Sequence, residues 1–474
     1  EEGRTLALVG ESGCGKSQTA LSILRLVDPN AYHPPPSQVW FEGRDLLTCD
    51  EDQMRAIRGN DIAMIFQEPM TSLNPLYRVG NQLSEPLRLH QGLDRVQARR
   101  RSIELLEEVG IPSAAARVDA FPHEMSGGMK QRVMIAMALA GRPRLLIADE
   151  PTTALDVTIQ AQVLQLMKQL QQQTGMAILL ITHDLGVVAE TAERVAIMYA
   201  GEIVETAAVP EFFANPRHPY SQRLFDAMPT PQKRHRRLSA IEGQVPTLDR
   251  RFDGCRFAER CAHAASVCRQ QLPPWRGAPD HGYRCHFDDL VHAAAPTSAD
   301  PAAAAGGSAT GGQLLLDVTD LKLWFPIRRG ILRRTVGHVR AVDGVDLALS
   351  RGRTLALVGE SGCGKTTAGK GILQLIRPTA GSVLLNGEEL TLLKGEALRR
   401  RRADMQLIFQ DPASSMNPRK TVEEIVAEGL DVLAHGISGE QRRRRLEEIL
   451  AQVGIPADAL GRYPHEFSGG QRQR

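Results

Sequence analysis

The sequence predicts an α/β protein in which one domain occurs twice. Its 474 residues are enough for about three domains at roughly 150 residues each. Gly3–Lys16 recurs unchanged as Gly352–Lys365, and Pro122–Gly128 recurs with one change as Pro464–Gly470. This spacing indicates a duplicated domain, because solenoid repeats are only about 20–50 residues long. In both copies a short apolar run, typical of a buried parallel strand, precedes a helical pattern.

Composition and charge exclude several classes of protein. Hydrophobic residues make up 42% and charged residues 24% of the chain, a balance typical of packed globular domains. The net charge is +2, from 57 Lys and Arg against 55 Asp and Glu, so no overall basic field indicates a nucleic-acid partner. No apolar run approaches the roughly 18 residues of a membrane-spanning helix, and the N-terminus does not resemble a signal peptide. These features predict a soluble chain of the cytosolic type.

Three arginine runs need a separate interpretation. Arg99–Arg101, Arg399–Arg402 and Arg442–Arg445 could bind nucleic acid or lipid headgroups. They lie in segments with helical periodicity and interspersed glutamates, so we interpret them as solvated helix faces.

The domain boundaries follow from the repeat and from one stretch of biased composition. The first copy spans 1–210, a cysteine-containing extension spans 211–290, and the second copy spans 313–474. Residues 291–312 are rich in Ala, Gly, Pro and Ser and are predicted to be a flexible linker. The first copy starts, and the second stops, inside the pattern, so we expect a fragment of a longer protein. Uncovered apolar faces of the second sheet predict poor solubility for the fragment alone.

Each copy contains a loop suited to binding phosphate. Gly10–Ser17 and Gly359–Thr366 fit the pattern G-x-x-x-x-G-K-[ST]. Each follows an expected buried strand, Thr5–Val9 or Thr354–Val358, and precedes an expected helix, residues 17–27 or 366–376. Glycines let the backbone N–H groups of such a loop face a phosphate at the positive end of a helix. The alternative, a glycine-rich turn with an incidental lysine, does not explain two copies in the same context.

Specific roles follow for the residues of these loops. Lys16 and Lys365 are expected to reach the β- and γ-phosphates, and the Ser17 and Thr366 hydroxyls to hold Mg²⁺. The predicted nucleotide-binding residues are Gly10, Ser12, Gly13, Gly15, Lys16 and Ser17 in the first loop, and Gly359, Ser361, Gly362, Gly364, Lys365 and Thr366 in the second.

Two further strands of the first copy end in polar residues. Leu145–Asp149 is followed by Glu150, which places two carboxylates at one strand end. This pair suits a metal-holding aspartate, Asp149, and a water-activating base, Glu150. Gly175–Thr182 is a third apolar run and is followed by His183.

Together these motifs resemble the ATP-binding-cassette (ABC) ATPases over nearly the whole chain. Ser126–Gly128 and Ser468–Gly470 are similar to the family signature motif, which binds the γ-phosphate of a nucleotide held by the opposite cassette. Gln67 and Gln410 resemble the Q-loop glutamines, residues 154–156 the D-loop, and His183 the switch histidine.

The resemblance implies a fold, cofactors and site residues. It implies two P-loop NTPase domains, each with a RecA-like core and a helical subdomain, that bind ATP and Mg²⁺. It implies Glu150, His183 and Gln67 as catalytic residues. The implied Mg²⁺-site residues are Ser17, Gln67, Asp149, Thr366 and Gln410.

ABC ATPases work as a nucleotide sandwich between two cassettes. The resemblance therefore implies that Ser468, Gly469 and Gly470 complete the site of Lys16, and that Ser126, Gly127 and Gly128 complete the site of Lys365. The acid pair and histidine of the second copy are not found before Arg474. Trp324 or Phe325 is a candidate for stacking on adenine, although either residue could instead belong to a strand core.

A narrower resemblance is to the ATPases of oligopeptide and dipeptide importers. It depends on Phe66–Pro75, on Phe409–Pro418 and on Asn215–Leu224 in the extension. It implies two membrane permease subunits and an extracytoplasmic solute-binding protein as partners, no nucleic acid, and a peripheral position on the cytoplasmic face of the bacterial inner membrane. Peptides, glutathione, nickel and peptide-like antibiotics all remain open as solutes. The alternative, a soluble tandem ABC ATPase of translation or DNA repair, is disfavoured by the nearly uncharged linker and the extension.

Four cysteines of the extension fall close together in the sequence. Cys255, Cys261, Cys268 and Cys285 lack the close C-x₂₋₄-C pairs typical of zinc sites, whereas four thiolates at looser spacing can hold a [4Fe–4S] cluster. The importer extension resembles this arrangement, and some members carry such a cluster. An iron–sulfur cluster is favoured; zinc and reduced structural thiols remain open. Nearby arginines would offset the negative charge of a cluster: Arg256, Arg260, Arg269 and Arg284.

Overall fold

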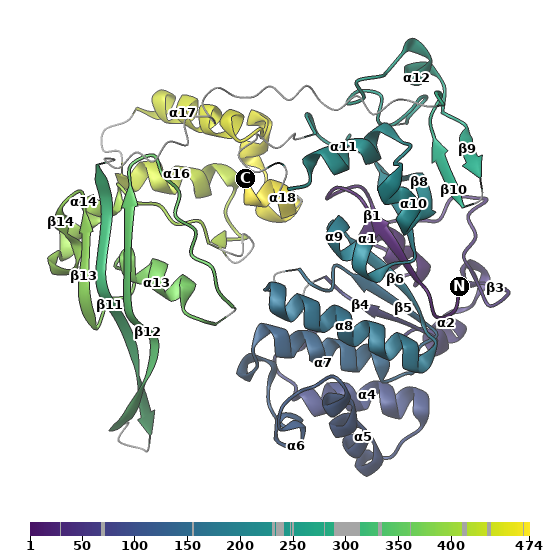
Figure 1. Ribbon diagram of the computed structural model, residues 1–474, viewed down its shortest axis with the longest axis horizontal. Coiled ribbons are helices and arrows are strands. Elements are labelled where there is room, and N and C mark those ends of the chain that lie inside the picture. Colours follow the sequence, from purple (N-terminus) through teal and green to yellow (C-terminus); the bar gives the residue numbers. More distant parts are fainter. Residues whose placement is uncertain are drawn as a thin grey trace. The chain divides into compact units, whose positions relative to one another are not determined.

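The computed structural model describes most of the chain, in two compact units. The units are residues 1–305 and 306–474, and each is described here by itself (Figure 1). The described residues are 1–28, 30–67, 72–153, 156–229, 233, 241–246, 248, 251–278, 280–288, 313–329, 334–360, 362–409, 415–433, 438–467 and 469–474. The predicted linker, 291–312, therefore lies outside them. None of the helices in these ranges is long and apolar enough to span a bilayer.

The first unit is built on one eight-stranded sheet. Neighbouring strands follow the order β4-β5-β6-β1-β7-β8-β10-β9. The strands in sequence order are β1 (Thr5–Val9), β4 (Ile62–Ile65), β5 (Leu145–Asp149), β6 (Ala177–Thr182), β7 (Arg194–Tyr199), β8 (Glu202–Ala208), β9 (Trp275–Ala278) and β10 (His281–Arg284). The five strands from β4 to β7 in this order are parallel, whereas β8, β9 and β10 are added antiparallel. Because parallel strands end at the same edge, the loops after β1, β4, β5 and β6 meet there.

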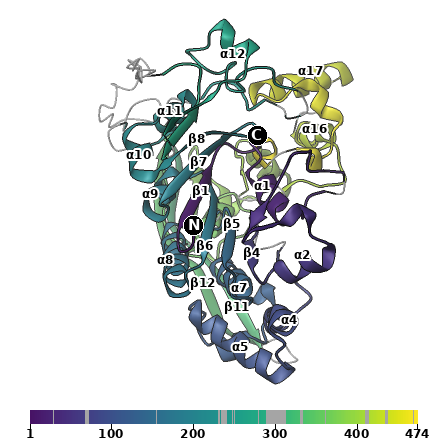
Figure 2. The same cartoon turned by 90° about the vertical axis from the view of Figure 1, so that its right-hand side faces the viewer.

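Helices cover both faces of this sheet. Alternation along β1 turns Leu8 toward one face and Ala7 and Val9 toward the other. In Figure 2, α8 and α9 lie on one side of the strands and α1 and α2 on the other. These four helices span Lys16–Ile23 (α1), Glu51–Ile57 (α2), Val157–Thr174 (α8) and Leu185–Thr191 (α9). A short hairpin, β2 (Trp40–Phe41) and β3 (Arg44–Asp45), and the 3₁₀ turn η1 (Leu46–Thr48) precede α2.

A group of helices extends the unit beyond the sheet, as expected for a helical subdomain. They are α4 (Val79–Gln91), α5 (Arg95–Glu108), α6 (Ala114–Arg117) and α7 (Gly127–Leu139), with the 3₁₀ turn η2 (Pro122–Glu124) before α7. In Figure 1 they gather below α8. Residues of α4, α5, α7 and α8 share one buried core with β4, β5 and β6. This core fixes the N-terminus of α7, which carries the signature motif, relative to the sheet.

The cysteine-containing extension continues the sheet of the first unit. Its strand β10 pairs with β8, and β9 pairs with β10. Its helices are α10 (Val209–Ala214), α11 (Pro219–Ala227) and α12 (Ser266–Gln270). Tyr199 of β7, Tyr220 of α11 and Phe257 are each at most 1% exposed and belong to one core. The extension therefore packs directly against the strand that ends beside the phosphate loop.

The second unit contains an antiparallel sheet and a set of helices. The sheet has the order β12-β11-β13-β14. Its strands are β11 (Leu314–Arg329), β12 (Arg334–Ser350), β13 (Ala380–Leu385) and β14 (Glu388–Glu389). The helices are α13 (Lys365–Ile372), α14 (Gly395–Arg402), α16 (Val422–Leu433), α17 (Gly439–Gln452) and α18 (Gly469–Gln473). The 3₁₀ turns are η5 (Leu390–Leu392), η6 (Ala457–Gly461) and η7 (Pro464–Glu466).

The prediction of a buried strand at Thr354–Val358 is wrong. The segment has no strand structure, and Leu355, Leu357 and Val358 are 50%, 51% and 87% exposed. In the first unit, β1 lies between β6 and β7. Among the described residues of the second unit no strand corresponds to β6 or β7, so this apolar run has neither ladder partners nor cover. The expected poor solubility of residues 1–474 remains a prediction that this exposure supports.

The interpretation of the arginine runs as solvated helix faces is confirmed. Arg99 and Arg101 of α5 pair with Asp119 and Glu108 at 2.7 Å. Arginines of the runs on α14 and α17 likewise pair with nearby acidic side chains, whereas Arg402 donates to the carbonyl oxygens of Leu373 and Gln374.

Candidate functional site

The first phosphate loop joins β1 to α1 and is tightly enclosed at its start. A Cβ on Gly10 would lie 2.2 Å from the carbonyl oxygen of Met198 in β7. Gly15, which caps α1, has φ of 105°, a conformation that favours glycine. Gly10 is thus required because the backbone of β7 approaches it closely, and Gly15 because its backbone is left-handed.

The side chain of Lys16 lies within this loop and binds its backbone. Its side chain is 6% exposed, and its Nζ donates to the carbonyl oxygens of Gly10 at 2.7 Å and Glu11 at 3.1 Å. The ammonium group therefore lies beside the N-terminus of α1, where backbone N–H groups and the helix dipole favour an anion. The arrangement suits a phosphate group.

Asp149, the last residue of β5, lies next to Ser17. Burial raises the pKa of Asp149 above its ordinary value, and the nearby Ser17 hydroxyl opposes this shift. Its Oδ1 is buried without a hydrogen-bond partner among the described residues. A serine hydroxyl beside a carboxylate with one unused buried oxygen is an oxygen donor set that fits Mg²⁺. We therefore judge that Ser17 and Asp149 fit the metal that the resemblance implies.

Glu150 is held by three side chains at the same edge. Its Oε2 accepts from Gln67 Nε2 at 2.9 Å and from Thr153 Oγ1 at 2.9 Å, and its Oε1 lies 3.3 Å from His183 Nδ1. Burial alone would raise the pKa of Glu150. The contacts with His183, Thr153 and Gln67 outweigh burial and lower that pKa to about 2. The carboxylate is thus kept ionised, as a base must be.

His183 follows β6, which pairs with β5. Its side chain is 63% exposed, and the hydrogen bond with Glu150 raises its pKa above the ordinary value. The structure therefore brings together the predicted residues Lys16, Ser17, Gln67, Asp149, Glu150 and His183 at one sheet edge. Thr153 was not predicted, and only its place three residues after Glu150 could have indicated it.

The signature motif of the first copy forms a helix start. The hydroxyl of Ser126 caps α7 by accepting from Met129 N at 3.3 Å. A Cβ on Gly127 would meet nothing within 4 Å, while one on Gly128 would lie 3.1 Å from Ile159. An open glycine at an uncovered helix N-terminus leaves room for another group to approach.

The second phosphate loop repeats the local geometry of the first. Lys365 Nζ donates to the carbonyl oxygens of Gly359 and Glu360, each at 2.6 Å. Gly362 and Gly364 have φ of 83° and 100°, close to the values of Gly13 and Gly15. Thr366 lies in the first turn of α13, as Ser17 does in α1.

Some predicted residues of both copies are not described. Ser361, Gln410, Ser468 and residues 154–155 of the D-loop lie outside the described ranges, while Gly469 and Gly470 begin α18.

Trp324 does not belong to the core of the second unit. Leu321 and Leu323 are buried on one side of β11, whereas the indole N–H of Trp324 donates to Asp343 at 2.9 Å and Arg340 lies over its ring. Phe325 is 40% exposed. Adenine stacking by either residue stays a prediction, and the strand-core alternative does not fit Trp324.

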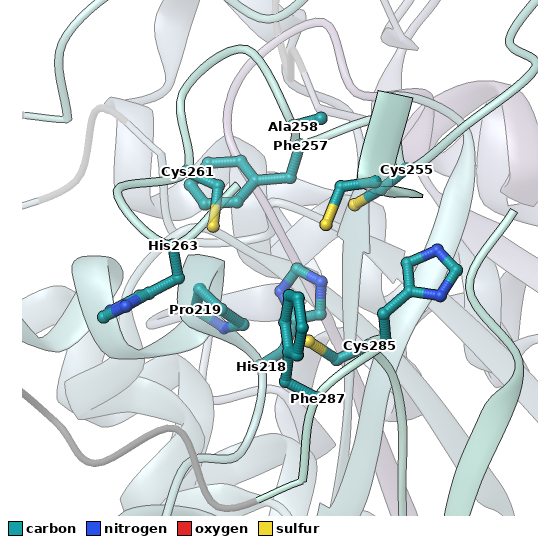
Figure 3. A pocket seen from close by; sticks show the side chains of 11 residues that line it. His218, Pro219, Cys255, Phe257, Ala258, Cys261, His263, Cys285 and Phe287 are labelled. Carbon is teal, nitrogen blue, oxygen red and sulfur yellow. The ribbon is translucent and has the colours of Figure 1, made fainter. Parts of the chain in front are cut away.

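The four cysteines of the extension line one pocket. Cys255, Cys261, Cys268 and Cys285 border it together with His218, His263, His286, Pro219 and Phe257. Figure 3 shows the labelled sulfurs of Cys255, Cys261 and Cys285 facing a common space. Burial raises the thiol pKa of Cys255 to about 12, with a further contribution from the other three cysteines. The fold thus brings the four thiols close to one another.

The pocket does not have the geometry of a single-ion site. Within the described ranges, no group of three or more His, Cys, Asp or Glu side chains is placed to hold one metal ion. Zinc and a [4Fe–4S] cluster both stay predictions for this pocket. The guanidinium groups of Arg256, Arg260 and Arg284 contact Ala200, Glu11 and Glu202 respectively, so a role for these arginines in offsetting the charge of a cluster stays a prediction. Burial raises the pKa of Cys261 and of Cys285, and Arg223 and Arg276 respectively oppose this shift slightly.

Comparisons with known proteins agree with the arrangement at the sheet edge. The family described as "ABC transporter" matches residues 1–153 and 342–474. The family "Oligopeptide/dipeptide transporter, C-terminal region" matches residues 204–268. This second match includes most of β8, the whole of α11 and three of the four cysteines.

Curated relatives match along the whole chain. The peptidoglycan transport ATP-binding protein YejF of Agrobacterium fabrum is 43% identical over 100% of this chain and 73% of its own length. The glutathione import ATP-binding protein GsiA of Pectobacterium atrosepticum is 44% identical over 100% of this chain and 69% of its own. Among solved structures, the ATP-binding cassette MJ0796 bound to ADP and Pi matches with a TM-score of 0.40 and 29% identity, over 44% of this chain and 87% of that one.

Proposed function

Because this chain belongs to the ABC transporter family of ATP-binding proteins, in its oligopeptide/dipeptide branch, we propose that its two cassettes power the import of peptide-like solutes. The chain is an ATPase of the importer type. The observation that carries the proposal is the joint presence of the assembled edge at Lys16, Asp149, Glu150 and His183 and of the transporter extension that packs on it.

The residues of this edge have separate tasks in hydrolysis. Lys16 and the glycine-rich backbone bind and orient the terminal phosphates. Ser17 and Asp149 would hold Mg²⁺, which would supply positive charge to offset that on the phosphoryl oxygens. The Glu150 carboxylate orients the attacking water and accepts its proton, and His183 keeps this carboxylate in place. Gln67 binds the other oxygen of Glu150 and so links the Q-loop to the base.

Hydrolysis is proposed to need both cassettes. Ser468, Gly469 and Gly470 would close the site of Lys16, and Ser126, Gly127 and Gly128 the site of Lys365. The cap at Ser126 and the open space at Gly127 support this role, since they leave a helix N-terminus accessible. The predicted coupling of the Q-loop region to membrane permeases, with the chain on the cytoplasmic face of the bacterial inner membrane, belongs to the same proposal.

The solute is proposed to be a peptide or a peptide derivative. The named relatives are a peptidoglycan transport protein and a glutathione import protein, and peptidoglycan and glutathione both contain amide bonds between amino acids. An extracytoplasmic solute-binding protein would select among such solutes. The alternative role in translation or DNA repair is disfavoured, because the two named relatives that match the whole chain are a transport protein and an import protein.

A [4Fe–4S] cluster is proposed as a structural group of the extension. Cys255, Cys261, Cys268 and Cys285 would each bind one iron. Because every iron of such a cluster takes its own thiolate, the sulfurs need not converge on one point. The supporting observation is that all four line one pocket. ATP hydrolysis moves no electrons, so the group would tie the four segments together, and reduced structural thiols are the alternative.

Uptake in the source cell tests the proposed function. Labelled dipeptide, glutathione and peptidoglycan-derived peptide are compared in wild type, chromosomal Glu150→Gln and the control Glu190→Gln, an exposed residue of α9. We expect loss of uptake of at least one solute in Glu150→Gln alone, and the solute that is lost identifies the class. Unchanged uptake of all three, with the variant protein at normal abundance, would contradict the proposal.

A further inference from the structure

The first phosphate loop is attached to the extension through its second residue, Glu11. Both carboxylate oxygens of Glu11 accept hydrogen bonds from Arg260, at 2.7 and 3.1 Å. Arg260 lies 249 positions later in the chain, directly before Cys261. The two residues therefore join the nucleotide site of the cassette to the segment that carries the cysteines.

Arg260 is held in one position. Its side chain is 5% exposed. Beyond the two bonds to Glu11, its guanidinium donates to the carbonyl oxygens of Glu242 at 2.8 Å and Ile241 at 3.1 Å, and to Tyr199 Oη at 3.3 Å. A guanidinium has five N–H groups, so all of its donor capacity is used. Such a partly buried bidentate ion pair has a more fixed geometry than a surface pair.

A second contact fixes the backbone of the same residue. The N–H of Glu11 donates to Tyr220 Oη at 3.0 Å. Tyr220 is completely buried and packs against Tyr199 and Phe257, with ring centroids 4.7 and 5.4 Å away. Because Tyr220 belongs to α11 and Phe257 to the cysteine segment, the extension determines where this N–H points.

A third contact holds the far side of the loop. The N–H of Gly201 donates to the carbonyl oxygen of Cys14 at 2.8 Å, and Arg256 binds the carbonyl oxygen of the preceding residue, Ala200. Arg256 and Arg260 come from the same segment between Cys255 and Cys261. The cysteine segment thus supports the loop both directly and through the turn after β7.

We propose that Arg260 is a positioning residue for nucleotide binding, through which the extension sets the shape and the charge of the first phosphate loop. This inference rests on the proposal that the loop of Lys16 binds ATP. Arg260 compensates the carboxylate of Glu11, which would otherwise repel the phosphates a few residues away from Lys16. It also keeps Glu11 turned from the concave side of the loop, where Lys16 binds the Glu11 carbonyl oxygen.

The second loop provides a comparison within the same chain. Glu360 occupies the position of Glu11, and its carbonyl oxygen binds Lys365 in the same way. Among the hydrogen bonds of the described residues, none joins the Glu360 carboxylate to an arginine, and Lys365 is more exposed than Lys16. The contribution of Arg260 is therefore specific to the first loop.

Equilibrium binding of a fluorescent ATP analogue tests this inference. The full chain carries Lys365→Ala, so that only the first loop can bind the analogue. We expect Arg260→Gln to weaken binding roughly five- to thirtyfold, and Arg260→Lys to weaken it less. Adding Glu11→Gln to Arg260→Gln should restore part of the affinity, because the uncompensated carboxylate is then removed. A role in packing alone would not give this rescue.

Controls separate the inference from general destabilisation and from the proposed function. Arg276→Gln is the matched control, since Arg276 pairs with Asp288 and the carbonyl of His286 in the same extension. Arg276→Gln should leave the affinity for the ATP analogue unchanged. In a Lys16→Ala background, where only the second loop can bind the analogue, Arg260→Gln should also leave the affinity unchanged. Equal losses in Arg276→Gln and Arg260→Gln, or no rescue by Glu11→Gln, would overturn the role of Arg260. Binding that survives Lys16→Ala together with Lys365→Ala would instead refute the nucleotide sites themselves. Were Arg260→Gln to misfold, Arg260→Lys with and without Glu11→Gln gives the same comparison.

Discussion

The imidazole of His183 lies 3.3 Å from the carboxylate of Glu150, with Nδ1 facing Oε1. This contact joins the ends of β5 and β6, two neighbouring parallel strands. Gln67 and Thr153 donate to the other oxygen, so Oε2 accepts two hydrogen bonds while Oε1 has one contact. A lone pair of Oε1 is therefore left for the attacking water beside His183. The pair therefore braces the base at the oxygen that can still accept a hydrogen bond from water.

Glu150→Gln should separate binding from hydrolysis. The amide keeps the size of the side chain but cannot accept a proton, so ATP binding is expected to persist while turnover falls by roughly 10²- to 10⁴-fold. ATPase activity of the assembled transporter, measured beside nucleotide affinity, checks this, with Glu190→Gln as the control. Near-normal turnover would mean that another residue is the base or that the other site carries the activity.

The pH dependence of stability should reveal the Glu150–His183 pair. The pKa of His183 is raised in the folded state by Glu150, so its stabilising contribution is complete below the unfolded pKa of about 6.5 and is lost as the pH rises through the folded value. The pKa of Glu150, about 2, implies that its own contribution disappears only on strong acidification.

Denaturation of three proteins at about pH 6 and about pH 8 measures this effect. Wild type should lose more unfolding free energy over this interval than either Glu150→Gln or His183→Gln, and the two variants should behave alike. The comparison cancels all groups that are common to the three proteins. An identical pH response in wild type and variants would show that the two side chains are not coupled in solution.

Two glycines of the first cassette should respond differently to alanine. Gly10→Ala places a Cβ 2.2 Å from a backbone oxygen, and we expect a loss of about 1–3 kcal/mol in unfolding free energy together with weaker nucleotide binding. Gly127→Ala meets nothing within 4 Å, so its stability should stay at the wild-type value while hydrolysis in the assembled transporter falls. Thermal melts combined with nucleotide binding distinguish the two. Equal stability of Gly10→Ala and wild type would contradict the observed enclosure.

The cysteine pocket predicts that the purified chain contains iron and sulfide. Protein purified without oxygen should carry iron and acid-labile sulfide, and Cys255→Ser should lose both. Cys363→Ser, at an exposed cysteine outside the pocket, is the matched control and should retain them. Iron-free protein with four alkylatable thiols in the extension would establish the alternative of reduced structural thiols.

Local motifs were enough to predict most of the candidate site. Lys16, Asp149, Glu150 and His183 each follow an apolar run that forms a parallel strand, and such strands end at one edge of their sheet. The family resemblance added Gln67, which no local pattern identifies. The strand expected at Thr354–Val358 failed because an apolar run becomes a strand only if neighbouring strands accept its hydrogen bonds. The same sequence that forms β1 in the first copy is exposed in the second.

The sequence by itself determined the duplication, the phosphate loops and the class of chemistry, because these depend on residues that are close together in the chain. Only the tertiary structure decided which distant residues act on these loops. The pairing of Arg260 with Glu11, the placement of Tyr220 at the loop backbone and the gathering of four cysteines around one pocket depend on how β8 and β10 join the extension to the cassette. Contacts between residues far apart in the chain arise from packing, and no local pattern in one sequence specifies them.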